Sequence, residues 1–197
     1  PDHPGLRQFS LVRPDQLNSD PACPRYADEQ VVDLQPEQIE RYAVALDAVI
    51  ESAKAAGRSP DDILCEVLST WPAPLKAVMK QRGMGRFCVT QKADPRNPND
   101  VYRPENTSAA DWIMTGNHDT KPLWRIAEER QSSEWIHGRS RLLADRLVPE
   151  PERRGTFAAR IASDYRLFCE AMFAELFLGP ARNVSVFFVD LLGEKQL

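Results

Sequence analysis

The 197-residue sequence is poor in histidine, cysteine and glycine, with only 3, 4 and 9 of each. Three histidines argue against a metal site built from several imidazoles, and we predict neither a bound metal nor another cofactor. The four cysteines are widely spaced, so a disulfide scaffold is excluded. Cys65 and Cys88 lie in apolar runs and are typical of small core residues in a reducing compartment. We therefore expect a cytoplasmic protein.

The sequence also lacks a basic surplus and a long apolar run. Lys and Arg total 25 against 29 Asp and Glu, for a net charge of -4, so nothing favours nucleic acid or an anionic membrane as a partner. No apolar run reaches the ~20 residues that span a bilayer, and no signal-like segment opens the chain. The 42% hydrophobic fraction is that of an ordinary globular protein.

Residues 1–197 are predicted to form one domain, with residues 1–34 as an irregular, proline-broken lead-in. From residue 35 onward, helical and strand-like patterns alternate. The predicted helices cover about 36–56, 74–82, 122–127, 133–147 and 154–178, and the predicted strands cover 63–68, 86–91, 112–116 and 184–193. Such alternation predicts parallel strands, and hence an α/β fold. About four βα units over residues 35–197 would be the C-terminal half of a TIM (β/α)8 barrel.

Three predicted strands carry an acid at or near the C-terminal end: Glu66, Asp119 and Asp190. Barrels of this class keep their chemistry at that end. Two carboxylates from different strands suit glycoside cleavage, because one protonates the leaving oxygen while the other attacks or stabilises the oxocarbenium-like centre. An apolar run such as the one around Glu66 suits a carboxyl group that must carry a proton. We expect Glu66 and Asp119 to face a common sugar-sized gap.

Ordinary structural roles compete with these assignments. Asp119 can be a helix cap beside a surface histidine, and Glu66 can face solvent at a strand edge. Trp71 and Trp124 can stack on sugars, although an aromatic residue near a strand end is more often part of the core. Asp94, in the long loop over 92–106, can bind glucan or be a solvated turn residue.

Four segments of the sequence resemble those of one enzyme family. The run TGNHD at 115–119, with RPEN upstream at 103–106, resembles the strand-seven region of the 4-α-glucanotransferases (amylomaltase or disproportionating enzyme, glycoside hydrolase family 77). LCEVL at 64–68 is similar to the strand-five acid segment of that family, and DLLG at 190–193 is similar to its strand-eight end. The resemblance covers roughly residues 35 to 197.

The resemblance implies that Glu66 is the general acid/base. It implies that Asp119 is a third carboxylate, which binds hydroxyls of the sugar at the cleavage point and stabilises the transition state. His118 would assist in binding those hydroxyls. Together with candidates from the loop and strand ends, the predicted substrate-binding residues are His118, Asn117, Asp94 and Trp71. The implied partners are α-1,4-glucans such as maltooligosaccharides, glycogen or starch.

The sequence departs from the family in two places. Val67, Leu68 and Ser69 follow Glu66, where the family has an acidic residue and then Leu-Gly. The family's nucleophilic Asp lies on strand four in an Arg-x-Asp-His-like motif, which the 197 residues do not contain. Because the chain also begins at Pro1 without Met, we expect a piece of a longer enzyme, with the nucleophile upstream and no activity in this piece alone.

We therefore predict a 4-α-glucanotransferase that moves a glucan segment to a new acceptor by retaining double displacement. Two other classes stay open. One is a non-catalytic glucan-binding or structural half-barrel. The other is a metal phosphohydrolase of the His-Asp type, for which only His3 and His137 remain as further imidazole ligands beside His118.

Overall fold

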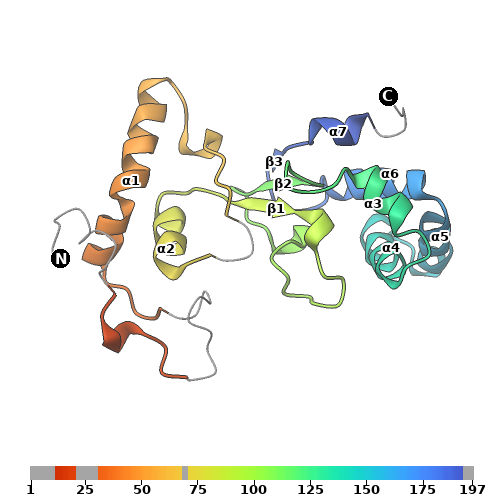
Figure 1. Ribbon diagram of the computed structural model, residues 1–197, viewed down its shortest axis with the longest axis horizontal. Helices are drawn as coiled ribbons and strands as arrows, with labels where there is room; N and C mark the ends of the chain where they lie inside the picture. The colour runs from red at the N-terminus through yellow and green to blue at the C-terminus, as the bar shows by residue number, and fades with distance from the viewer. Residues whose placement is uncertain (1–11, 21–30, 68–70, 193–197) are drawn as a thin grey trace. The chain divides into compact units, whose positions relative to one another are not determined.

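A computed structural model of the protein (Figure 1) describes residues 12–20, 31–67 and 71–192. The chain divides into two compact units, Pro1–Arg86 and Phe87–Leu197. The described residues form seven α-helices and one three-stranded parallel sheet, a mixed architecture compatible with the α/β class. Whether the two units fold as the one predicted domain stays a prediction.

The first unit contains the helices α1 (Pro36–Ala55) and α2 (Ala73–Gln81), close to the positions predicted from apolar spacing. Gly57 follows α1 with a φ of 74°, a left-handed conformation that glycine adopts without strain at a helix C-terminus. Ile50 of α1 and Met79 of α2 are buried together, so the two helices share one apolar cluster.

The described part of the lead-in is tied to α1 by a pair of amides. The Gln16 side chain donates to Gln38 Oε1 across 2.6 Å, and the Gln38 side chain donates back to Gln16 Oε1 across 2.7 Å. Leu17 and Val31 add one antiparallel bridge. Apart from a 3-10 turn over Pro14–Gln16, the described residues of this segment are irregular, as predicted.

The predicted strand over 63–68 is wrong for the residues that the structure describes, which end at residue 67. Cys65 makes a single parallel bridge with Arg86, and no strand extends around it. The Val67 backbone N–H donates to the Cys65 carbonyl across 2.9 Å, which closes a three-residue turn and interrupts an extended run. Burial raises the pKa of the Cys65 thiol, whereas Glu66, inside the turn, is exposed.

The second unit is built on a sheet of order β1-β2-β3, with all neighbours parallel. Its strands are β1 (Phe87–Val89), β2 (Trp112–Met114) and β3 (Asn183–Val184), shorter than predicted. Cys88 and Ile113 are 1% and 0% exposed, and they pack in one apolar cluster with Leu176, which follows α6. Parallel pairing of these strands is confirmed, and β2 lies at the centre.

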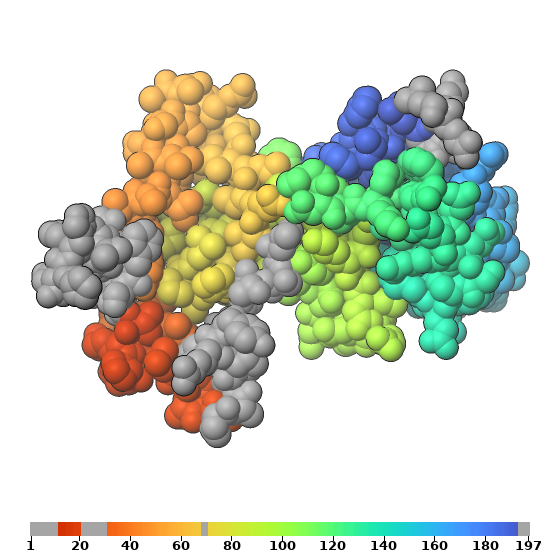
Figure 2. Space-filling model, viewed as in Figure 1, coloured from red at the N-terminus to blue at the C-terminus, as the bar shows by residue number. Residues whose placement is uncertain are grey.

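Four helices connect β2 to β3 and pack on one another (Figures 1 and 2). They are α3 (Leu123–Glu129), α4 (Glu134–Leu147), α5 (Pro151–Ser163) and α6 (Tyr165–Glu175). Their shared core consists of Leu123, Ala127, Ile136, Leu143, Ile161, Ala162, Phe168, Ala171 and Met172. No helix in the described ranges is both long and apolar enough to cross a membrane.

The single long helix predicted over 154–178 is wrong, because the chain forms two helices there. Asp164 lies between α5 and α6 in an extended conformation, with φ of -125° and ψ of 103°. Its carboxylate accepts hydrogen bonds from the backbone N–H groups of Arg166 and Leu167, at 3.0 and 3.2 Å. An Asp that caps a new helix ends the one before it, although the apolar spacing continues through both.

The strand predicted over 184–193 is also wrong beyond its first residue. β3 ends at Val184, Ser185 adds one backbone hydrogen bond to Ile113, and the chain then turns into the short helix α7 (Phe188–Leu191). Phe188 and Leu191 are 67% and 68% exposed, so the apolar composition of this segment does not reflect burial. Gly193 lies outside the described residues.

The long loop between β1 and β2 is ordered by its own Asp and Asn side chains. Asp94, Asn97 and Asp100 each accept a hydrogen bond from the backbone N–H two residues later. The Asn106 side chain donates to the carbonyls of Pro98 and Asp100, both at 2.8 Å. This is the compact type of long loop whose side chains replace regular backbone pairing.

A charge network joins this loop to the helices. Arg139 of α4 and Glu175 of α6 form an ion pair with both side chains 0% exposed. Arg146 links Glu175 to Glu105 of the RPEN segment, and Glu105 also pairs with Arg103 at 2.6 Å. Burial raises the pKa of Glu175 and lowers that of Arg139, while their attraction opposes both shifts. The RPEN segment therefore has a structural role in this chain.

Removing one member of the buried pair should lower the free energy of unfolding far more than removing both. We expect Glu175→Ala to lower the unfolding free energy by about 3–5 kcal/mol, because it leaves Arg139 charged and buried without its anion. The double variant Arg139→Met/Glu175→Leu should lose much less, since Arg146 keeps Glu105. Urea unfolding of the three chains tests this, and a double variant as unstable as Glu175→Ala would contradict it.

In the first unit, Arg82, at the C-terminal end of α2, forms ion pairs with two acids of α1. Its guanidinium donates to Asp47 (Nε to Oδ1, 2.8 Å) and to Glu40 (Nη2 to Oε2, 2.8 Å). These hydrogen bonds lower the pKa of both carboxyl groups below their ordinary values. Because the folded state favours the charged carboxylates, the stabilisation is present at neutral pH and is lost as the pH falls through the lowered pKa values.

The Asp47→Asn variant should show this pH dependence. At pH 7 we expect it to be less stable than the parent by no more than about 1 kcal/mol, since the pair is partly solvated. The difference should begin to close near pH 4, where an Asp side chain of ordinary pKa gains its proton, and should vanish once the pH is below the lowered pKa of Asp47. Urea midpoints measured against pH test this, with Glu51→Gln, an exposed acid paired with Lys54 on the same helix, as the matched control.

Candidate functional site

The segment after β2 forms a tight turn that is closed by its own polar groups. The Asn117 N–H donates to Thr120 Oγ1 at 2.9 Å, and the Thr120 N–H donates back to the Asn117 carbonyl at 3.0 Å. The Asn117 side-chain oxygen accepts from the Asp119 N–H at 3.2 Å. Asn117 is 4% exposed and thus shapes the turn from within. Its predicted contact with substrate stays a prediction.

Glycine at position 116 is required by close packing. A Cβ atom there would lie 2.5 Å from Thr120 Oγ1 and 2.6 Å from Gln91 Nε2. Contacts below about 3.0 Å force neighbouring atoms to move, and the Thr120 hydroxyl is the group that closes the turn. Gly116 therefore lets the ends of β1 and β2 approach each other.

His118 and Asp119 are the residues that this turn presents to solvent. Their side chains are 65% and 59% exposed, and the His118 Nε2 lies 3.5 Å from the Asp119 Oδ1. They form an ion pair when His118 is protonated. Both follow the C-terminal end of the central strand, as the sequence predicted. The arrangement offers a carboxylate and an imidazole side by side for hydroxyl groups of a ligand.

Asp190 holds the turn at both of its ends. One carboxylate oxygen accepts from the Thr115 hydroxyl and the other from the Leu123 backbone N–H, both at 2.7 Å. Asp190 is 4% exposed and its second contact is the first residue of α3. Its position in α7 corrects the expectation that it ends a strand. Asp190 thus orients Thr115 and the start of α3.

Gln91 is a site residue that sequence reasoning missed. It is 7% exposed, its N–H donates to the Thr115 carbonyl at 3.1 Å, and its side chain lies against Gly116. Neither amide atom of the side chain has a hydrogen-bond partner among the described residues. The signal was present, because a polar residue directly after an apolar strand reaches the same edge of a parallel sheet as Asp119.

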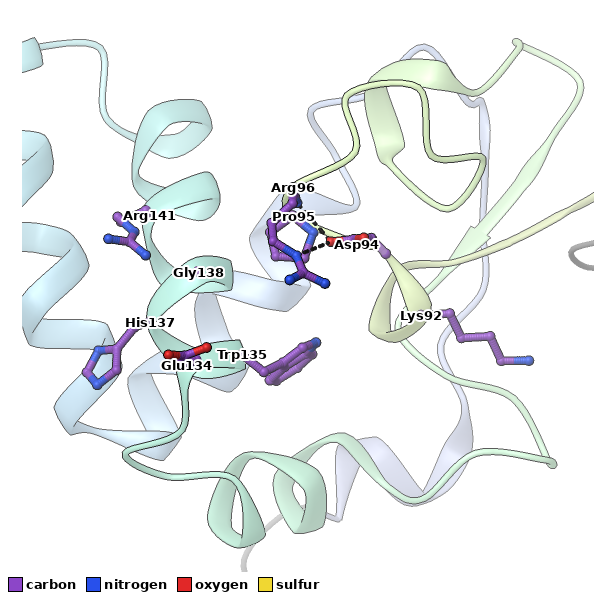
Figure 3. A pocket seen from close by; sticks show the side chains of 10 residues that line it. Lys92, Asp94, Pro95, Arg96, Glu134, Trp135, His137, Gly138 and Arg141 are labelled. Atoms are coloured by element: carbon purple, nitrogen blue, oxygen red, sulfur yellow. Dashed lines mark hydrogen bonds and ion pairs between the residues drawn. The ribbon is translucent and has the colours of Figure 1, made fainter.

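Asp94 lines a pocket of about 790 Å³ next to α4 (Figure 3). Figure 3 shows α4, with His137 and Arg141, on one side of the pocket and the Asp94–Arg96 pair on the other. The Arg96 backbone N–H donates to Asp94 at 2.9 Å and holds the pKa of that carboxyl below its ordinary value. Asp94 is thus ionised and half-buried in a hollow that can hold a ligand.

The remaining candidates, Trp71 and Glu66, belong to the first unit. The Trp71 ring packs on the apolar cluster of that unit, with Lys76 Nζ at 5.4 Å and Arg86 Cζ at 5.0 Å from its centroid. Both cations are within the distance of a favourable cation–π contact, so side chains of the same unit already lie against this ring. The sugar-sized gap between Glu66 and Asp119 stays a prediction, as does a sugar contact of Trp71.

Within the second unit, the described His, Cys, Asp and Glu side chains do not form a group of three that could hold a metal ion. Comparisons with known proteins found no matching family model, no matching curated protein and no matching solved structure. The functional argument for this chain therefore rests on its own residues and their arrangement.

A Gly116→Ala substitution should disturb the turn. We expect a loss of about 1–3 kcal/mol of stability, because the added methyl group displaces the Thr120 hydroxyl or the buried Gln91 amide. Gly155→Ala is the matched control, since it lies inside α5 with no atom within 4 Å of the new methyl group. That control should be stabilised by roughly 0.5–1 kcal/mol. Equal effects of the two substitutions on the urea midpoint would contradict the packing argument.

Proposed function

We propose that this chain contributes to the active site of an enzyme that cleaves glycosidic bonds with retention. The observation that carries the proposal is the exposed His118–Asp119 pair, 3.5 Å apart, at the C-terminal end of the central parallel strand. A carboxylate at that position can bind sugar hydroxyls and stabilise an oxocarbenium-like transition state. Gln91 and Asp94, which follow β1, place further polar groups in the same part of the second unit.

Within that class, the enzyme we propose is a 4-α-glucanotransferase acting on α-1,4-glucans. The support comes from how the TGNHD segment divides in space. Thr115, Gly116 and Asn117 are buried and shape the turn, whereas His118 and Asp119 are exposed. A motif of five residues that separates into three framework positions and two accessible ones has the form expected of a ligand-binding turn.

The proposed fold is the C-terminal half of a TIM barrel. The three strands lie in the order of their sequence and are all parallel, as successive strands of such a barrel are. A doubly wound sheet would instead reverse its strand order at a switch point. The loop from β1 to β2 contains only 3-10 turns in its described residues, so a long loop takes the place of a crossover helix there.

In the proposed mechanism Glu66 protonates the glycosidic oxygen of the leaving glucan, and it later removes a proton from the acceptor hydroxyl. Asp119 holds sugar hydroxyls through the intervening transition states, and His118 supports that contact. A retaining reaction also requires a nucleophilic carboxylate, which the family resemblance assigns to an Asp outside the motifs found here. Transfer exceeds hydrolysis when the bound acceptor sugar keeps water away from the intermediate.

The decisive experiment is incubation of the full-length enzyme with maltotriose, followed by chromatography of the products. We expect glucose together with longer maltodextrins. Glu66→Gln should lower transfer by about 10²–10⁴-fold, because it removes the proton donor. Asp119→Asn should lower it by about 10²–10³-fold, because it removes charge that stabilises the transition state.

Two exposed acids outside the candidate site provide the controls, Glu51→Gln and Asp145→Asn. Both should keep parental transfer, and circular dichroism should show that all four variants fold. An unchanged maltotriose pattern with the parent enzyme overturns the proposal. If maltotriose binds without turnover, the chain belongs to the class of non-catalytic glucan-binding proteins. Near-parental transfer by Glu66→Gln would show that the acid is another residue.

A further inference from the structure

A second pocket lies directly beside the His118–Asp119 turn. It has a volume of about 530 Å³, within the range of roughly 300–1,000 Å³ that is usual for small-molecule sites. Gln91 and Thr120 line it after the ends of β1 and β2. Lys92 lines it from the 3-10 turn after β1, Lys121 from the loop before α3, and Arg130 from the C-cap of α3. Its ligand therefore meets three cationic side chains and the buried amide.

The pocket is positively charged although the whole chain carries a net charge of -4. The one acid that lines it, Glu129, accepts hydrogen bonds from Lys121 at 2.6 Å and from Arg125 at 2.9 Å. Its charge is thus balanced by two cations. Lys92 and Arg130 have no acidic partner within 4.0 Å among the residues described. An anion entering the pocket meets net positive charge.

Arg130 is oriented by Trp135, which also lines the pocket. The Arg130 guanidinium lies 4.9 Å from the centroid of the Trp135 ring, and the Phe168 ring lies 5.8 Å from that centroid. With an arginine and a phenylalanine already against it, the indole does not offer an open platform for a sugar ring. The contact instead holds the guanidinium in place, which reduces the entropy lost when it binds an anion.

The Gln91 amide supplies a second, independent indication of a ligand. It is 7% exposed and lines the pocket, and neither its oxygen nor its nitrogen has a hydrogen-bond partner in the described part of the chain. A buried amide without partners is costly, so such groups in folded proteins are usually satisfied by a ligand or an ordered water. A hydroxyl group can both donate to and accept from this amide.

We propose that this pocket binds a phosphate group, either as free phosphate or as part of a hexose phosphate. Lys92, Lys121 and Arg130 hold the phosphate oxygens, and in a hexose phosphate a hydroxyl of the sugar hydrogen-bonds to Gln91. Gln91 also packs against Gly116, so a ligand bound to Gln91 would contact a side chain that supports the turn carrying Asp119. The site does not depend on glucan transfer.

Isothermal titration of the full chain tests the site, with glucose 6-phosphate, inorganic phosphate and glucose as separate probes. We expect saturable binding of glucose 6-phosphate with a Kd of about 1 mM or lower, and weaker binding of glucose. Arg130→Gln should weaken phosphate binding by about tenfold, the usual effect of losing one charge-assisted hydrogen bond. Arg153→Gln, an exposed arginine of α5 outside the pocket, is the matched control.

Tighter binding of glucose 6-phosphate than of phosphate, lost in Gln91→Leu, identifies the sugar phosphate as the ligand. Equal binding of the two identifies free phosphate. Unfolding in urea shows whether Gln91→Leu is folded. If that variant does not fold, the comparison of Arg130→Gln with Arg153→Gln still tests the phosphate site. The proposal is overturned if neither glucose 6-phosphate nor inorganic phosphate binds saturably, if glucose binds as tightly as the phosphate probes, or if Arg130→Gln and Arg153→Gln have the same affinity for phosphate.

Discussion

The candidate turn of the second unit depends on one buried carboxylate, that of Asp190. Its two oxygens hold Thr115 at the end of β2 and Leu123 at the start of α3, both at 2.7 Å. All the residues of the candidate turn lie between these two anchor points. A carboxylate that is 4% exposed needs such donors to offset its lost hydration, so folding of α7 and closure of the turn support each other.

Around Asp190, buried polar groups determine the path of the backbone, whereas exposed polar groups are accessible to a ligand. Gly116, Asn117 and Thr120 set the path of the turn, and His118 and Asp119 project from it. The same division holds farther out. The buried Arg139–Glu175 pair and its extension through Arg146 to Glu105 hold the long loop against the helices. In the same loop Asp94 lines the first pocket, and Lys92 lines both pockets.

Much of the local structure could be predicted from apolar spacing and capping residues. The helix from Pro36, the Ser133 cap of α4 and the central strand at Trp112 all follow from short-range chemistry. The errors lie where one pattern allows two outcomes. An apolar spacing that runs through Asp164 does not show that its carboxylate caps a second helix, and an apolar composition around residue 188 does not show that the side chains stay exposed.

The sequence by itself determined that polar residues follow the central strand at Trp112–Met114, and parallel pairing then places them at the same edge of the sheet as the residues that follow β1. It singled out His118, Asp119 and the TGNHD segment on this ground. Only the tertiary structure decided the role of Asp190 and the importance of Gln91. Both roles depend on contacts between segments far apart in the chain, up to 75 residues for Asp190 and Thr115. Hydrogen bonds at such separations produce no periodic pattern in the local sequence from which they could be predicted.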